Sequence, residues 1–114
     1  MRTVIFGVRS IEEITADILR AAESDGDATP RISFPSTESL WSVLNPRRLA
    51  LLKVMVGQGP LSMREVARRA RRDVKAVHGD LTLLLEAGVI DRAEGGVVFP
   101  YDRIHVDYVL DAAA

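Results

Sequence analysis

The apolar positions near the start of the chain predict a short strand followed by an amphipathic helix. Residues 2–8, RTVIFGV, are mostly β-branched or apolar, as in a strand. Residues 10–22 repeat apolar side chains at helical spacing, and Ser10 with Glu13 forms a capping-box pattern at the start of this helix. Residues 23–30, ESDGDATP, show no periodicity and predict a linker. The apolar face of the helix carries Ile11, Ile14, Ile18 and Ala21.

A second strand and a short helix are expected after the linker. The strand candidate is RISF, residues 31–34. After Pro35, Ser36 can cap a short helix whose apolar residues are Leu40, Val43 and Leu44. Trp41 lies one helical turn before Leu44 on the same face, so we expect it in the core or at an interface.

Three further helices are expected over residues 45–56, 61–70 and 74–87. Asn45, Ser62 and Asp73 precede them and can accept a hydrogen bond from a free N–H of the first turn. Pro46 suits a first helical position, and Gly88 suits the left-handed residue that ends a helix. The side chains expected to face the core are Leu49, Leu52, Val56, Val74, Val77, Leu81, Leu84 and Leu85.

The period then changes from helical to two, which predicts strands. Residues 89–93 and 97–99 read as a hairpin around the turn EGG, residues 94–96, where glycine allows positive φ. Residues 104–110, IHVDYVL, read as a half-buried strand. Its apolar side carries Ile104, Val106, Tyr108 and Leu110.

This order of elements predicts an α+β fold built on a winged helix-turn-helix. Three helices followed by a hairpin are typical of that domain, which we expect over residues 31–114, with the strand at 104–110 as a C-terminal addition. Residues 1–30 are expected to form an N-terminal strand–helix extension that ends in the acidic linker.

Composition limits the class of protein. A chain of 114 residues can bury one core, and the absence of cysteine removes disulfides and thiol chemistry and suits a reducing cytoplasm. The N-terminus lacks the apolar run of a signal peptide, and no stretch is long and apolar enough to span a membrane. We therefore expect a soluble cytoplasmic protein.

Charge is unevenly distributed along the chain, although the formal net charge is only −1. Residues 45–92 contain ten Lys or Arg and five Asp or Glu, a net of +5, whereas the remainder contains five basic and eleven acidic residues, a net of −6. A basic middle segment indicates an anionic partner.

The helices expected at 61–70 and 74–87 have the features of a DNA-binding pair. A short connection, RRD, joins them, and small apolar residues (Ala67, Ala70, Val74 and Val77) would let the helices cross closely. In a helix-turn-helix the second helix enters the major groove. The residues expected at double-stranded DNA are Ser62, Arg64, Arg71, Arg72, Lys75, Ala76, His78, Gly79, Thr82 and Arg92.

Other charged residues of this segment have a structural alternative. Arg68 and Arg69 can pair with Glu65 on the helix surface instead of binding DNA. Asp80 would repel phosphate if it were exposed, so we expect it to orient Arg47 or Arg48, which would then be partly structural.

The helix pair resembles a known group of regulators. LSMREVARRARRDVKAVHGDLTLLLEAGVI resembles the core of DeoR-like and MarR-like winged-helix regulators. Over about residues 31–108 the chain resembles small prokaryotic DNA-binding proteins described as antitoxin-like transcriptional regulators, most specifically in LNPRRLALL, RRDVKAVHGDL and FPYDRI. The resemblance implies a winged-helix fold and DNA binding.

The function expected is therefore sequence-specific regulation of transcription by a homodimer, as a repressor or an autoregulating antitoxin. The alternative is a winged-helix docking module without DNA readout, with a protein partner such as a toxin bound through the acidic N-terminal unit. Catalytic motifs are absent, and His78 and His105 lie on different elements, so no enzyme activity, cofactor or metal site is expected.

Overall fold

A computed structural model of the chain describes residues 1–23, 29–110 and 112. The elements, in order, are β1 (Thr3–Val8), α1 (Ile11–Glu23), β2 (Arg31–Phe34), α2 (Thr37–Val43), α3 (Pro46–Met55), α4 (Met63–Ala70), α5 (Val74–Glu86), β3 (Asp91–Ala93), β4 (Gly96–Val98) and β5 (Arg103–Asp107). The α+β class is thus confirmed. Most of the linker expected at 23–30 lies outside the described residues. None of the described helices has the length and apolar character needed to cross a bilayer.

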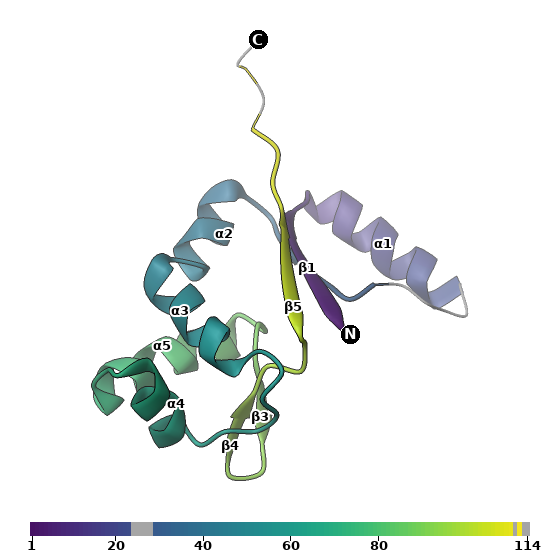
Figure 1. The fold of residues 1–114 in the computed structure, drawn as a ribbon. Helices are drawn as coiled ribbons and strands as arrows, with labels where there is room; N and C mark the ends of the chain where they lie inside the picture. The colour runs from purple at the N-terminus through teal and green to yellow at the C-terminus, as the bar shows by residue number, and fades with distance from the viewer. Residues whose placement is uncertain (24–28, 111, 113–114) are drawn as a thin grey trace.

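The two ends of the described chain meet in one parallel sheet of order β2-β1-β5. Phe6 of β1 is level with Ile32 of β2 and with Val106 of β5. Figure 1 shows β1 and β5 side by side, with α2 and α3 on one side of them and α1 on the other. A division of the chain at residue 30 would separate β1 from both of its pairing partners.

The apolar face of this sheet joins the helices in a single core. Phe6 is fully buried and makes edge-on ring contacts with Phe34, at a centroid distance of 6.4 Å, and with Phe99, at 6.3 Å. Phe99 follows β4, so this contact links the sheet to the part of the chain that carries α3, α4 and α5. The remaining fully buried residues include Val4, Leu40, Leu51, Leu52, Met55, Val66, Val77, Leu81 and Leu84.

The predicted helix starts are confirmed because each cap residue holds a backbone N–H of the first turn. Ser36 accepts from Ser39 at 3.1 Å, and Asn45 from Arg48 at 2.9 Å. The other three caps and their donors are Ser10 with Glu13 at 3.1 Å, Ser62 with Glu65 at 3.0 Å and Asp73 with Ala76 at 3.1 Å. Gly88 after α5 has φ +76°, as expected of a left-handed helix end.

Two apolar side chains that were expected on a buried face, Val74 and Leu110, are exposed. Val74 is 45% exposed because it begins α5, and Leu110 is 82% exposed because β5 ends at Asp107. On α1, Ile11 and Ile18 are exposed, so its apolar face is not part of the core. Trp41, expected in the core or at an interface, is 41% exposed and contacts Tyr108 edge-on at 5.6 Å, so it lies outside the core and the interface alternative stays open.

The buried face of α3 is broader than the apolar spacing predicted. Leu51 and Met55 are fully buried together with Leu52, whereas Leu49 and Val56 are only half-buried. The reason is that α3 packs against both α4 and α5, so more than one stripe of side chains is covered.

The predicted hairpin is confirmed as the antiparallel pair β3–β4, with Glu94 and Gly95 in its turn. Gly95 has φ +79°, as expected, but Gly96 does not have positive φ. Gly96 is required for another reason: a Cβ there would overlap the carbonyl oxygen of Leu61 and lie 2.7 Å from its carbonyl carbon. Leu61 and Val97 exchange two backbone hydrogen bonds of 2.8 Å, which attach the hairpin to the segment before α4.

Candidate nucleic-acid interface

Helices α4 and α5 are joined by residues 71–73, a turn that depends on one left-handed residue. Arg71 ends α4 with φ 56° and ψ 47°, and no other described residue except glycine has positive φ. The backbone N–H of Arg72 donates to the carbonyl of Ala67 at 3.1 Å, and Asp73 then caps α5. Three residues are therefore enough to end α4 and begin α5.

The two helices pack through small side chains, as predicted for part of the stripe. Ala67 on α4 and Val77 on α5 are buried, and Ala70 is half-buried. Val74 does not join them, because it is exposed. This packing leaves the opposite side of α5 free of contacts with α4.

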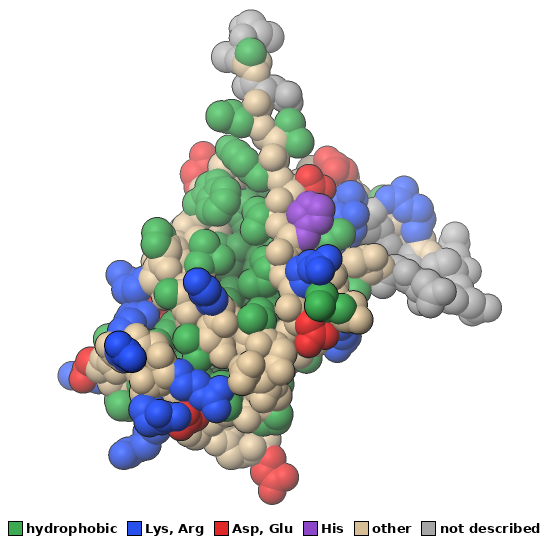
Figure 2. All heavy atoms as spheres, in the orientation of Figure 1, with side chains coloured by type: hydrophobic (Ala, Val, Ile, Leu, Met, Phe, Trp, Pro, Cys, Tyr) green, Lys and Arg blue, Asp and Glu red, His purple; other side chains and the backbone are tan. Residues whose placement is uncertain are grey.

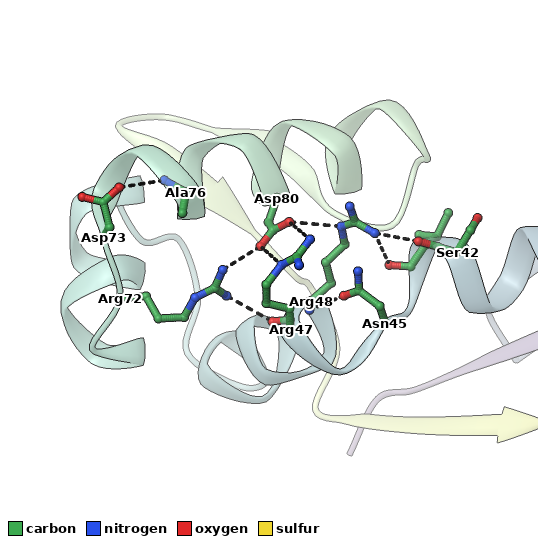
Figure 3. Close-up of polar contacts among 9 residues, drawn as sticks. Ser42, Asn45, Arg47, Arg48, Arg72, Asp73, Ala76 and Asp80 are labelled. Atoms are coloured by element: carbon green, nitrogen blue, oxygen red, sulfur yellow. Dashed lines mark hydrogen bonds and ion pairs between the residues drawn. The ribbon is translucent and has the colours of Figure 1, made fainter.

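Asp80, the one buried charged side chain among the described residues, lies where α3, α5 and the turn meet. Its carboxylate accepts from Arg47 Nε at 3.2 Å and from a terminal guanidinium nitrogen of Arg72 at 2.8 Å. Arg48 Nε lies 3.3 Å from the other carboxylate oxygen. Figure 3 shows the three guanidinium groups converging on this carboxylate.

The cluster around Asp80 also fixes backbone groups. Arg48 donates to the carbonyl of Ser42 at 2.6 Å, which ties α3 to the end of α2, and Arg72 donates to the carbonyl of Arg47 at 3.3 Å. Burial alone would raise the pKa of Asp80. The hydrogen bonds from Arg72 and Arg47 and the charges of Arg47 and Arg48 outweigh burial, so the pKa of Asp80 is lowered and its carboxylate is charged at neutral pH.

The prediction that Asp80 orients Arg47 and Arg48 is confirmed, whereas its contact with Arg72 was missed. A signal for it exists in the sequence: position 80 is spaced three residues from Val77 and four from Leu84, on the buried face of α5. An acid at such a position needs cationic partners, and Arg72 precedes the helix by two residues.

The carboxylate of Glu65 on α4 forms ion pairs with two arginines, Arg68 and Arg69. This is the structural alternative to DNA binding that was expected for these two residues. The Glu65 carboxylate accepts hydrogen bonds from Arg68 and from Arg69, whose Nε lies at 2.9 Å. These hydrogen bonds lower the pKa of Glu65 to about 2. Arg69 also donates to Gln58 at 3.0 Å. The charges of Arg68 and Arg69 are therefore partly neutralised within the protein.

The residues predicted to contact DNA fall into two groups. Arg72 turns inward to Asp80, with 23% of its side chain exposed, and Thr82 is half-buried, with its hydroxyl donating to the carbonyl of His78 at 2.8 Å. The others are exposed: Ser62, Arg64, Arg71, Lys75, Ala76, His78, Gly79 and Arg92. Ser62 also caps α4, and Gly79 has no atom within 4 Å of the position of a Cβ.

Four of the exposed residues are cations without a partner in the described part of the chain. No ion pair or side-chain hydrogen bond is formed there by Arg64, Arg71, Lys75 or Arg92. Figure 2 shows Lys and Arg side chains gathered over the end of the molecule where α4 and α5 lie. Within the described residues, no three His, Asp or Glu side chains are grouped to hold a metal ion.

A known protein family matches the part of the chain that contains α4 and α5. The match extends over residues 43–106, more than half of the sequence, and includes α3, α4, α5, the hairpin and most of β5. Among curated proteins and among solved structures, no match to the chain is found. The protein belongs to the HVO_A0114 family.

Proposed function

We propose that this protein is a sequence-specific regulator of transcription that binds double-stranded DNA as a dimer. In this proposal α3, α4, α5 and the β3–β4 hairpin form a winged helix-turn-helix, and α5 is the helix that enters the major groove. One observation supports the proposal most directly. On α4, the turn and α5, the acidic side chains of Glu65, Asp73 and Asp80 are bound within the protein, whereas several cations are exposed without ion pairs among the described residues.

The acidic side chains that could repel DNA at the turn are already engaged within the protein. Glu65 is held by two arginines, Asp80 is buried among three, and Asp73 caps α5. Arg64, Arg71 and Lys75 remain exposed without ion pairs among the described residues. This surface therefore carries free cations that can bind phosphate.

The side chains along α5 suit close approach to a groove. Arg71 and Lys75 flank the N-terminus of the helix, where the helix dipole also favours phosphate. Ala76 and Gly79 are small and exposed, so the helix backbone can come near base edges, and His78 offers a hydrogen-bonding ring. On the hairpin, Arg92 is positioned for a phosphate contact beside a short turn.

The experiment is a titration of the full chain against two duplexes at several salt concentrations. One duplex comes from upstream of the protein's own gene, and the other is a scrambled version of it. The expected result is a preference of about a thousandfold or more, with a steep negative dependence of log affinity on log salt. Failure to bind either duplex at low salt would overturn the proposal.

A matched pair of variants tests whether α5 is the helix that contacts DNA. Lys75→Ala removes a free cation from the proposed surface, whereas Lys53→Ala removes one from α3. We expect Lys75→Ala to lose about 1–3 kcal/mol of specific binding if the ammonium group contacts a base edge. Lys53→Ala should change affinity little, and equal losses in the two variants would argue against α5 as the reading helix.

A docking module is the second candidate, favoured by α1. This helix exposes Ile11, Ile18 and Leu19, at 69%, 64% and 61%, beside the acidic Glu12 and Glu13 of its first turn. Such a surface fits a basic, partly apolar protein partner, for example a toxin. Tight binding of a protein through α1, without any affinity for DNA, would favour this function over regulation.

A further inference from the structure

One edge of β5 is open. β5 pairs with β1 on its other side, and no described segment pairs with this edge. The N–H of Arg103 donates to the carbonyl of Arg2, in the direction of β1, at 3.2 Å. Because backbone groups alternate sides along a strand, the N–H and C=O groups of Ile104 and Val106 point to the open edge. They are available for pairing with another strand.

The sequence of β5, RIHVD, is complementary to itself when read in the opposite direction. If two copies run antiparallel about His105, Arg103 of each lies opposite Asp107 of the other, and Ile104 lies opposite Val106. Ile104 and Val106 are then the residues that exchange backbone hydrogen bonds, as their outward groups require. In the described part of the chain neither Arg103 nor Asp107 has an ion pair or a side-chain hydrogen bond.

Other registers lose this match. A shift of the two-fold axis to Ile104 places Arg103 opposite His105, and a shift to Val106 places Arg103 opposite Val109. Both shifts keep the backbone hydrogen bonds possible, but neither pairs opposite formal charges twice. The charges therefore select the register about His105.

Exposed apolar side chains lie near the open edge of β5. Trp41 and Tyr108 contact each other beside β5, with Trp41 41% exposed, and Val109 is 71% exposed just after the strand. Figure 2 shows a band of hydrophobic side chains between α2 and β5 on the face turned to the viewer. The opposite edge of the sheet, β2, is only four residues long and lies between Pro30 and Pro35, which discourages strand addition there.

We propose that a second copy of this chain pairs with β5 antiparallel about His105, which joins two three-stranded sheets into one continuous sheet. Arg103–Asp107 ion pairs form across the two-fold axis, one on each side of the His105 pair. The apolar band beside α2 is covered by the other copy. This dimer does not depend on DNA binding, so its test contains no DNA.

The test measures the mass of the full chain by sedimentation equilibrium over a range of concentrations. The wild-type protein is expected to approach twice 12.5 kDa. Arg103→Glu places two acids opposite each other at both ends of the interface, and Asp107→Arg places two cations there. Each variant alone should dimerise about tenfold more weakly, because two cross-strand pairs change from attraction to repulsion.

An equimolar mixture of the two single variants is the decisive sample. In the mixed dimer the glutamate introduced at position 103 meets the arginine introduced at position 107, and the unchanged Arg103 meets the unchanged Asp107. The affinity should therefore return close to the wild-type value. Arg31→Glu makes the same charge change on β2 and should leave dimerisation unaffected. A monomeric wild type, single variants that dimerise normally, or a mixture that stays monomeric would each overturn the proposal.

Discussion

At the scale of single residues, Arg71 has a left-handed backbone conformation that is unfavourable for its side chain, and its charge is exposed. Its left-handed conformation costs a residue that carries a Cβ about 1 kcal/mol relative to glycine. We predict that Arg71→Gly raises the free energy of unfolding by about 0.5–1 kcal/mol, measured by urea denaturation. The same variant should weaken DNA binding several-fold, because it removes a free cation at the start of α5. A more stable variant with unchanged affinity would show that Arg71 serves only the turn.

The contrast between Arg71 and Arg72 also shows what residue-level interpretation can and cannot reach. Position and charge predict that both contact DNA. The structure leaves Arg71 exposed and directs Arg72 to Asp80. Adjacent residues in a turn point in different directions, and which of them meets a buried carboxylate depends on where α3 and α5 lie.

At the scale of helices, Asp80 joins α3, the turn and α5. Asp80→Asn would leave Arg47, Arg48 and Arg72 without their shared anion, and we predict a loss of about 2–4 kcal/mol in the free energy of unfolding at pH 7.

The pH dependence of this loss is a second prediction from Asp80. Because the pKa of Asp80 is lowered in the folded protein, its contribution is complete above the unfolded value of about 3.9 and disappears as the pH falls through the folded value. The difference between wild type and Asp80→Asn in urea denaturation should therefore shrink below about pH 4. A difference that is equally large at pH 3 and pH 7 would contradict the ion network.

At the scale of strands, Gly96 sets the distance between the hairpin and the segment before α4. A Cβ at this position would meet the backbone of Leu61 and Ser62, and two hydrogen bonds to Val97 hold Leu61 in place. We predict that Gly96→Ala costs about 2 kcal/mol or more in thermal or urea unfolding. Gly79→Ala is the matched control: its Cβ would point into open space on α5, so this variant should gain about 0.5–1 kcal/mol.

At the scale of the whole molecule, β1 joins the two ends of the described chain in one sheet. β1 pairs with β2 and β5, and its Val4 and Phe6 are fully buried. We predict that a fragment of residues 31–114 does not unfold cooperatively, as judged by circular dichroism during heating, because it lacks the central strand of the sheet. A fragment that melts as sharply as the full chain would support an independent domain after residue 30.

The sequence alone determined the local structure of this protein. Helix starts depend on one side chain and a backbone N–H three residues away, and strand or helix periodicity depends on neighbours within a few residues, so Ser36, Asn45, Ser62 and Asp73 were identified correctly. The hairpin was also predictable, since its turn requires glycine at position 95.

Only the tertiary structure decided which distant segments meet. Parallel pairing of β1 with β5 joins residues about a hundred positions apart, and no short-range pattern specifies such a partner. The same holds for Arg72 at Asp80, for the exposure of α1, and for the approach of Leu61 that makes Gly96 necessary. These features depend on how the elements pack, because burial and long-range contacts belong to the assembled core and not to any one segment.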